Sequence, residues 1–187
     1  MSTTVPRNKM HNFRSKGFYI ARLKVADFKS ARDIFTSTFP DTSISKFHVA
    51  WRYRIKSSSI GIYTKEGDLV GFLLTDLGGY KYKNTHIDYL AVHPLYQKFR
   101  LGSCLLETLL EKECEASRSV SLTPLYSNHV WYWYHREGFN VTRYAEAEGG
   151  GVFTLMNFHP YPTRRHNRYL WFPSLLPVGG ASDRHVF

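Results

Sequence analysis

Hydrophobic and polar positions follow two different periods along the first half of the chain. Residues 17–23 alternate as a half-buried strand does, whereas the apolar side chains of 28–39 recur at helical spacing until Pro40-Asp41 ends the pattern. Residues 42–56 are less clearly patterned, and we interpret them as a second helix. Two apolar runs, 60–64 and 69–77, flank a polar turn and predict a β-hairpin.

The second half of the chain alternates strands with helices. Strands are predicted at 85–92, 120–122, 139–144 and 152–158, and helices at 101–117 and 128–137. The order β–α–(α)–β–β–β–α–β–α–β–β predicts a single mixed α/β domain in which helices pack on one sheet. We place this domain at 17–158, after a flexible basic arm (1–16) and before a C-terminal extension (159–187) with no assigned role.

Composition is consistent with a soluble cytoplasmic protein. Of the 187 residues, 43% are hydrophobic, enough for a core, yet no window of eighteen apolar residues predicts a membrane span. The N-terminus lacks the apolar stretch of a secretory signal. Cys104 and Cys114 lie ~15 Å apart along one predicted helix, so they cannot form a disulfide with each other.

The net charge of +10 leaves two kinds of partner to weigh. Dispersed basic clusters with no continuous basic helix face argue against nucleic acid as a partner, and attraction of an anionic cofactor explains part of the charge.

The histidines and cysteines show no metal-ligand spacing, so we expect no metal. Cys104 lacks a base in its sequence neighbourhood, so we interpret it as a packed thiol. The oligomeric state stays open, a homodimer included.

The segment His86–Glu111 reads as a strand, a short loop and a helix. The loop, Gln97-Lys98-Phe99-Arg100-Leu101-Gly102-Ser103, precedes the first turn of the helix, where unpaired backbone N–H groups and the helix dipole favour an anion. Lys98 and Arg100 add full positive charges. This loop therefore predicts a phosphate or pyrophosphate site.

The run Leu90-Ala-Val-His-Pro-Leu-Tyr-Gln-x-x-Arg-x-Gly-Ser resembles the acetyl-CoA motif of the GNAT superfamily of N-acetyltransferases. Gln97 and Gly102 match the motif Gln/Arg-x-x-Gly-x-Gly/Ala, but Arg100 occupies the position of its middle glycine. The resemblance, which covers about 18–158, implies a mostly antiparallel sheet flanked by helices and acetyl-CoA as cosubstrate. Cofactor contacts are then expected from Leu90, Ala91 and Val92 and from 97–103, each residue of that loop included.

A second segment, Asn128-x-x-Trp-x-Trp-Tyr134-x-x-x-Gly138-Phe139, resembles the family's Asn-x-x-Ala-x-x-Leu-Tyr-x-x-x-Gly-Phe. Tyr134 lies four residues before Gly138, as the family tyrosine does, which implies that it contacts the thioester sulfur and protonates departing coenzyme A. Asn128, an expected cofactor contact, is one residue nearer to the tyrosine than is usual.

The base that takes a proton from the acceptor is less clearly marked. Asp88 is the first candidate because family members often carry a carboxylate on this strand, and His86 is the second. Regular alternation would place both on the same face as Leu90. A chain of water molecules without a single base is the remaining alternative.

The resemblance implies transfer of acetyl to a primary amine by direct attack in a ternary complex. The acceptor should bind between 40–56 and the hairpin 146–152, where Asp41, Asp88, Glu146 and Glu148 could receive a cation. We favour a small di- or polyamine. A peptide or protein amine, either N-terminal or lysine, is the first alternative, and a non-catalytic module that binds acyl-CoA or nucleic acid is the second.

Overall fold

Seven strands form one mixed sheet in the computed structural model, which describes residues 17–55, 59–77, 83–124, 130–146 and 152–160. The spatial order is β1-β2-β3-β4-β5-β7-β6, and every neighbouring pair is antiparallel except β4 and β5. The strands are β1 (Phe18–Arg22), β2 (Ile60–Thr64), β3 (Leu69–Leu77), β4 (Asn84–Val92), β5 (Ser119–Leu122), β6 (Asn140–Glu146) and β7 (Val152–Phe158). The predicted mixed, mostly antiparallel sheet is confirmed.

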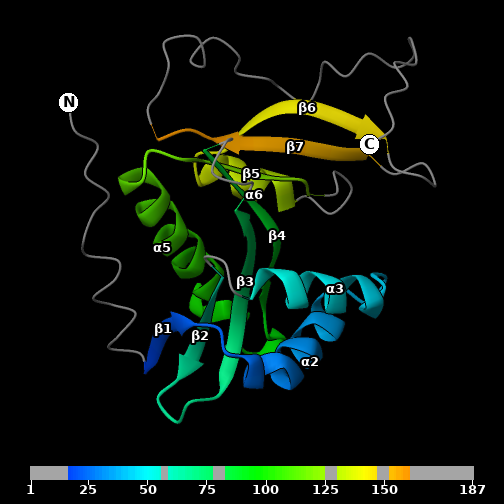
Figure 1. The fold of residues 1–187 in the computed structure, drawn as a ribbon, viewed down its shortest axis with the longest axis vertical. Helices are drawn as coiled ribbons and strands as arrows, with labels where there is room; N and C mark the ends of the chain where they lie inside the picture. Colours follow the sequence, from blue (N-terminus) through cyan, green and yellow to red (C-terminus); the bar gives the residue numbers. More distant parts are fainter. Residues whose placement is uncertain (1–16, 56–58, 78–82, 125–129, 147–151, 161–187) are drawn as a thin grey trace.

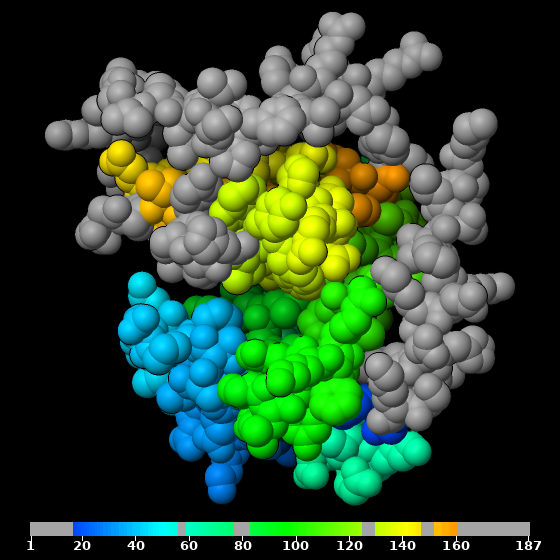
Figure 2. Space-filling model, turned by 180° about the vertical axis from the view of Figure 1, so that it is seen from behind, coloured from blue at the N-terminus to red at the C-terminus, as the bar shows by residue number. Residues whose placement is uncertain are grey.

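Helices cover both faces of this sheet (Figure 1). They are η1 (Val25–Asp27), α2 (Phe28–Thr38), α3 (Ile44–Arg54), η2 (Pro94–Phe99), α5 (Leu101–Glu115) and α6 (Val130–Arg136), where η marks a 3-10 helix. α2 and α3 lie on one face, while α5 and α6 share the opposite face, which Figure 2 shows. The predicted arm 1–16 and the extension beyond residue 160 lie outside the described residues.

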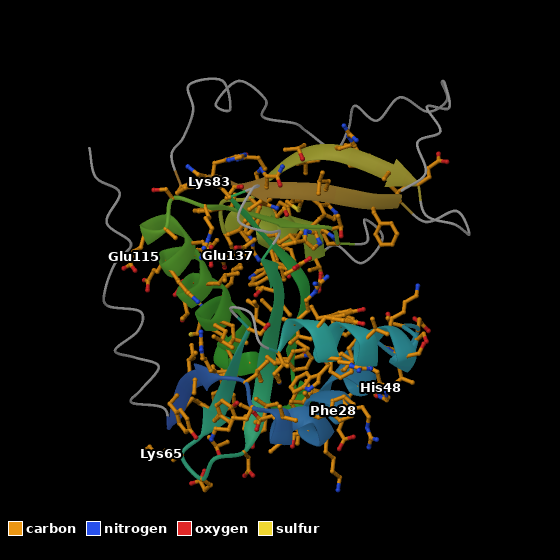
Figure 3. The ribbon with its side chains drawn as sticks, viewed as in Figure 1. Phe28, His48, Lys65, Lys83, Glu115 and Glu137 are labelled. Atoms are coloured by element: carbon orange, nitrogen blue, oxygen red, sulfur yellow. The ribbon has the colours of Figure 1, made fainter. Side chains whose placement is uncertain are left out.

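The two faces of the sheet carry two separate hydrophobic cores. On the α2 and α3 side, aromatic rings stack closely: the rings of Phe35 and Phe47 lie 4.4 Å apart, and Trp51 and Phe72 are buried beside them. Phe28 and His48, labelled in Figure 3, meet edge to face at 5.0 Å where these helices pack together. This packing fixes α3 against β4, which is the arrangement that forms a pocket.

The core on the other side is aliphatic and holds α5 against the sheet. Leu101, Leu105, Leu106 and Leu109 are all at most 1% exposed, so the stripe expected from their spacing is the buried one. At the far end of α5 the fully buried carboxylate of Glu113 accepts hydrogen bonds from Thr85 and Arg118. The bond to Thr85 ties the C-terminal end of α5 to β4, and the N-terminal end of the same helix carries the predicted anion site.

Candidate active site

β4 and β5 diverge half-way along β4. Their parallel pairing runs from Asn84↔Ser119 to Ile87↔Leu122 and ends there, although β4 continues to Val92 in pairing with β3. The chain turns away at Thr123-Pro124, and proline cannot donate to a ladder. Residues 88–92 of β4 therefore keep a backbone edge without a strand partner among the described residues, and an extended ligand could bind along this edge.

A β-bulge at Asp88 changes which side chains share a face. Leu74 and Thr75 of β3 are consecutive, but they pair with Tyr89 and Ile87, so Asp88 is the extra residue. Before the bulge, Ile87 faces the core under α5; beyond it, Leu90 does so. The expectation that Leu90 shares a face with His86 and Asp88 is therefore wrong, because the bulge shifts the alternation by one residue.

The loop after β4 leads directly into α5, at the place where the sequence predicts an anion site. η2 leads into α5 through Arg100, whose backbone is left-handed at φ 61° and ψ 26°. Gln97 is exposed, and its side-chain amide donates to the carbonyl oxygen of Val92 at 3.2 Å, which ties the loop to the end of the strand. Gly102 lies over Leu90, and a Cβ atom there would lie 3.4 Å from the Leu90 side chain.

The predicted cofactor loop divides into exposed and buried side chains. Lys98, Phe99 and Arg100 are exposed, so the two cations can reach a phosphate in solvent. Leu101 and Ser103 are buried; Leu101 belongs to the core, and the Ser103 hydroxyl donates to Glu137, labelled in Figure 3, at 3.3 Å. These two residues can contribute backbone N–H groups to an anion, while their side chains support the helix.

Tyr134 lies on α6, on the same side of the sheet as α5. Its side chain is only 7% exposed, and its ring contacts those of Trp133 and Phe139 at centroid distances of 4.6 and 5.6 Å. Burial raises the pKa of Tyr134 well above its ordinary value, so the phenol is protonated at neutral pH. Its hydroxyl makes no hydrogen bond to any residue that the structure describes. Asn128 lies outside the described residues.

A pocket of about 460 Å³ lies between α3 and the diverging strands. Six of its lining residues come from α3, three from β4 and one directly follows β5: Ser45, Lys46, Val49, Ala50, Tyr53, Arg54, His86, Asp88, Tyr89 and Thr123. Both predicted base candidates thus line one pocket, on the face of the sheet opposite α5. Of the other expected acceptor contacts, Asp41 and Glu146 are exposed outside this lining, and Glu148 lies outside the described residues.

Arg54 is a pocket residue that sequence reasoning did not single out. Its Nε donates to Oδ2 of Asp88 at 2.7 Å, and its Nη2 lies 3.0 Å from Oδ2 of Asp76. The guanidinium thus binds the carboxylate of Asp88 at the bulge and that of Asp76 on the neighbouring strand β3. No local signal marks this role, because Arg54 lies 34 residues from Asp88 in the chain.

His86 is held from the opposite side by β5. Its Nδ1 lies 2.9 Å from the hydroxyl oxygen of Ser121, its direct partner in the parallel ladder. Burial lowers the pKa of His86, and the nearby Arg54 guanidinium lowers it further, whereas Asp88 and Asp76 act in the opposite direction. Burial is the largest of these effects, so the imidazole is neutral at pH 7.

Metal-binding groups and membrane-spanning helices were sought in the described part of the chain alone. No group of three or more His, Cys, Asp or Glu side chains is arranged there to hold a metal ion. No helix in those same ranges is long and apolar enough to cross a membrane.

Comparison with solved structures gives several with this fold. The ribosomal-protein-S18-alanine N-acetyltransferase of Escherichia coli is 22% identical, with a TM-score of 0.65 over 83% of this chain and 99% of that one. A spermidine N-acetyltransferase chimera from Vibrio cholerae and hSSAT is 12% identical, with a TM-score of 0.62 over 77% and 96%. The Thermoplasma acidophilum Paia N-acetyltransferase, solved with coenzyme A, is 16% identical, with a TM-score of 0.56 over 76% and 98%.

Comparison with curated proteins gives no match. The sequence model of the acetyltransferase (GNAT) domain, in contrast, matches residues 24–159, from the residue before η1 to the residue after β7. The matched range includes the diverging strands, the loop before α5, and the pocket. The chain therefore belongs to the GNAT family of acetyltransferases.

Proposed function

We propose that this protein transfers the acetyl group of acetyl-CoA to a primary amine by direct attack in a ternary complex. One observation carries the proposal: the divergence of β4 and β5 leaves an open edge on β4 between the pocket, which Asp88 and Tyr89 line, and the loop before α5. A thioester that binds along the open edge of β4 would then lie beside an amine in that pocket. Such positioning of two reactants is itself a large part of the catalysis of acyl transfer.

The cofactor end of the site needs groups that bind phosphate and groups that polarise a carbonyl. Lys98, Arg100 and the first-turn N–H groups of α5 supply the first. The backbone of 90–92 supplies the second, because an N–H near Val92 can donate to the thioester oxygen as negative charge develops.

Asp88 is the residue that we assign to proton removal from the acceptor ammonium. It lines the pocket at the bulge, and its bond to Arg54 uses Oδ2, which leaves Oδ1 as the oxygen that can accept from a ligand. The proton passes to Asp88 directly or through water. His86 lines the same pocket, but its hydrogen bond to Ser121 favours a role other than proton removal.

Tyr134 then acts as the acid that protonates the thiolate of departing coenzyme A. Burial raises its pKa, so the phenol still carries its proton when the thiolate forms beside it, and its hydroxyl makes no competing bond to any described residue. The Tyr134 proton passes to the sulfur as the C–S bond breaks and free coenzyme A leaves. Because the amine attacks the thioester directly, no covalent enzyme intermediate forms.

The charges that line the pocket limit which kind of amine can be the acceptor. Of the three described carboxylates expected to receive a polycation, only Asp88 lines the pocket, and Arg54 already binds it. A di- or polyamine would thus find one shared carboxylate there. A peptide N-terminus, which carries one amine and several backbone hydrogen-bonding groups, suits this lining better.

Calorimetric titration of acetyl-CoA and a turnover assay on an amine panel test the proposal together. We expect micromolar binding, about −8 kcal/mol. Tyr134→Phe should bind acetyl-CoA as the wild type does but turn over ~100-fold or more slowly, the usual contribution of a general acid. Tyr132→Phe is the matched control, because Tyr132 lies on the same helix but is 55% exposed, and it should keep full turnover. Absence of binding at millimolar acetyl-CoA would refute the proposed activity.

A further inference from the structure

A hydrogen-bonded chain of polar side chains alternates between β5 and β4 and ends at His86. The hydroxyl of Ser119 donates to Oδ1 of Asn84 at 3.0 Å, and Nδ2 of Asn84 donates to the hydroxyl oxygen of Ser121 at 2.9 Å. Ser121 in turn lies 2.9 Å from Nδ1 of His86. Asn84 and His86 are two residues apart on β4, as Ser119 and Ser121 are on β5, so the parallel register brings all four side chains to one face.

The direction of these bonds determines which ring nitrogen of His86 carries hydrogen. Ser121 is buried, and its oxygen already accepts from Asn84. Its single hydroxyl hydrogen therefore goes to the one remaining partner, Nδ1 of His86. A neutral imidazole that accepts at Nδ1 carries its hydrogen on Nε2. The opposite tautomer would leave the hydroxyl hydrogen of a buried serine without an acceptor among the described residues, which is costly.

His86 therefore faces the pocket as a hydrogen-bond donor. It lines the pocket, and Nδ1 is engaged with Ser121, so Nε2 is the ring nitrogen left for a ligand. The charged groups around it, Asp88 and Asp76 on the sheet and Arg54 on α3, leave the ring neutral because burial dominates its pKa. A neutral N–H donor at this position favours a ligand oxygen, which can accept its hydrogen bond, over a ligand ammonium group, which can only donate.

We propose that Asn84 and Ser121 are positioning residues that hold His86 as an Nε2–H donor, and that the acceptor is an α-amino amide whose carbonyl oxygen receives this hydrogen bond. Such a group occurs at the N-terminus of a peptide and in an amino-acid amide. The inference rests on the proposed acetyl transfer and names the chemistry of its acceptor. Asp88, on the same side of β4 as His86, is then placed to contact the amine while His86 contacts the neighbouring oxygen.

The tautomer can be measured without any substrate. In ¹⁵N NMR of histidine-labelled protein at pH 8, the ring nitrogens that carry hydrogen are well separated from those that do not. The His86 signals are assigned by their loss in His86→Gln, since the chain has nine histidines. We expect Nε2–H in the wild type. In Asn84→Asp the carboxylate can only accept, so Ser121 donates to it and His86 switches to Nδ1–H. A wild type that is already Nδ1–H would overturn the inference.

Acceptor selectivity provides the second measurement. Alaninamide and 1,2-dimethylpropylamine share the same branching of their non-hydrogen atoms, but only the first carries a carbonyl oxygen. The ratio of their kcat/KM values should fall by about two- to tenfold in His86→Phe, which is the usual effect of one neutral hydrogen bond. The two amines differ in basicity, but this difference affects the wild type and His86→Phe equally, so it cancels when their ratios are compared. His48→Phe is the matched control, because His48 is exposed outside the pocket lining, and it should leave the ratio unchanged.

The outcomes separate this inference from the proposed function. Acetylation of both amines with an unchanged ratio in His86→Phe, or a clear preference for spermidine, would overturn the α-amino amide while leaving acetyl transfer in place. Absence of acetyl-CoA binding would instead remove the proposed function. Within the inferred class, the peptide Ala-Gly-Gly tested beside alaninamide distinguishes the sources: a higher kcat/KM for the peptide identifies a peptide N-terminus, and equal values identify a free amino-acid amide.

Discussion

Arg100 stands where the GNAT motif has glycine, and its backbone conformation gives the substitution a predictable energy. At φ 61° and ψ 26° a residue with a Cβ atom lies in the left-handed region, which costs roughly 1–2 kcal/mol. Glycine avoids this cost but loses about 0.5–1 kcal/mol more conformational entropy on folding. The difference predicts that Arg100→Gly is more stable than Arg100→Ala by about 0.5–1 kcal/mol. Both variants lack the guanidinium, so the comparison isolates the backbone.

The sign of this difference identifies a left-handed backbone, because glycine is less stable than alanine inside a right-handed helix. At the exposed position Glu111 inside α5, Glu111→Gly should be about 1 kcal/mol less stable than Glu111→Ala. Thermal unfolding followed by circular dichroism can resolve both pairs, since 1 kcal/mol shifts Tm by about 2–4 °C in a domain of this size. If Arg100→Gly unfolds at a lower temperature than Arg100→Ala, the left-handed turn before α5 is not the conformation in solution.

The same two variants report on the charge of the loop. An exposed guanidinium that pairs with phosphate contributes roughly 0.2–1 kcal/mol, so either variant should bind acetyl-CoA up to about fivefold more weakly. If Arg100→Gly binds more tightly than Arg100→Ala, closer approach of the loop to the pyrophosphate offsets part of that loss. The middle glycine of the motif would then serve both backbone conformation and cofactor contact.

Two further predictions concern stability. Glu113→Gln should lower the free energy of unfolding by about 1–3 kcal/mol in urea denaturation, because its fully buried carboxylate accepts from Arg118; the exposed Glu115→Gln, labelled in Figure 3, should change it by less than about 0.5 kcal/mol. The lowered pKa of His86 means that folding favours its neutral form, so stability is full above the ordinary pKa of 6.5 and falls at lower pH. Between pH 7.5 and 5.5 the Tm of the wild type should fall further than that of His86→Gln, and equal falls would contradict the assignment.

Much of the fold follows from local patterns. Three predicted strands, 60–64, 69–77 and 152–158, have the bounds that the structure shows, and the predicted second helix is α3 at Ile44–Arg54. Helix ends differ from the prediction by at most two residues: the predicted 101–117 is α5 at Leu101–Glu115. Apolar periodicity and turn residues act over a few positions, so a sequence reveals them directly.

The β-bulge shows where local reasoning ends. Regular alternation places His86, Asp88 and Leu90 on one face, but β3 passes Asp88 without a partner and the faces exchange beyond it. Nothing in the sequence of β4 requires this, because a bulge is a property of two paired strands. The Arg54 contact and the Ser121 contact likewise join residues 34 and 35 positions apart.

The sequence by itself determined the elements and the loop before α5, because strand and helix periods, the turn and the charges of Lys98 and Arg100 all lie within short stretches. It also determined the family, through the motif around Gln97 and Gly102. Only the tertiary structure decided how the acceptor side is built: that Arg54 holds Asp88, and that Ser121 holds His86. Those pairings arise when the parallel register and helix packing bring distant segments together, and a one-dimensional pattern does not contain that information.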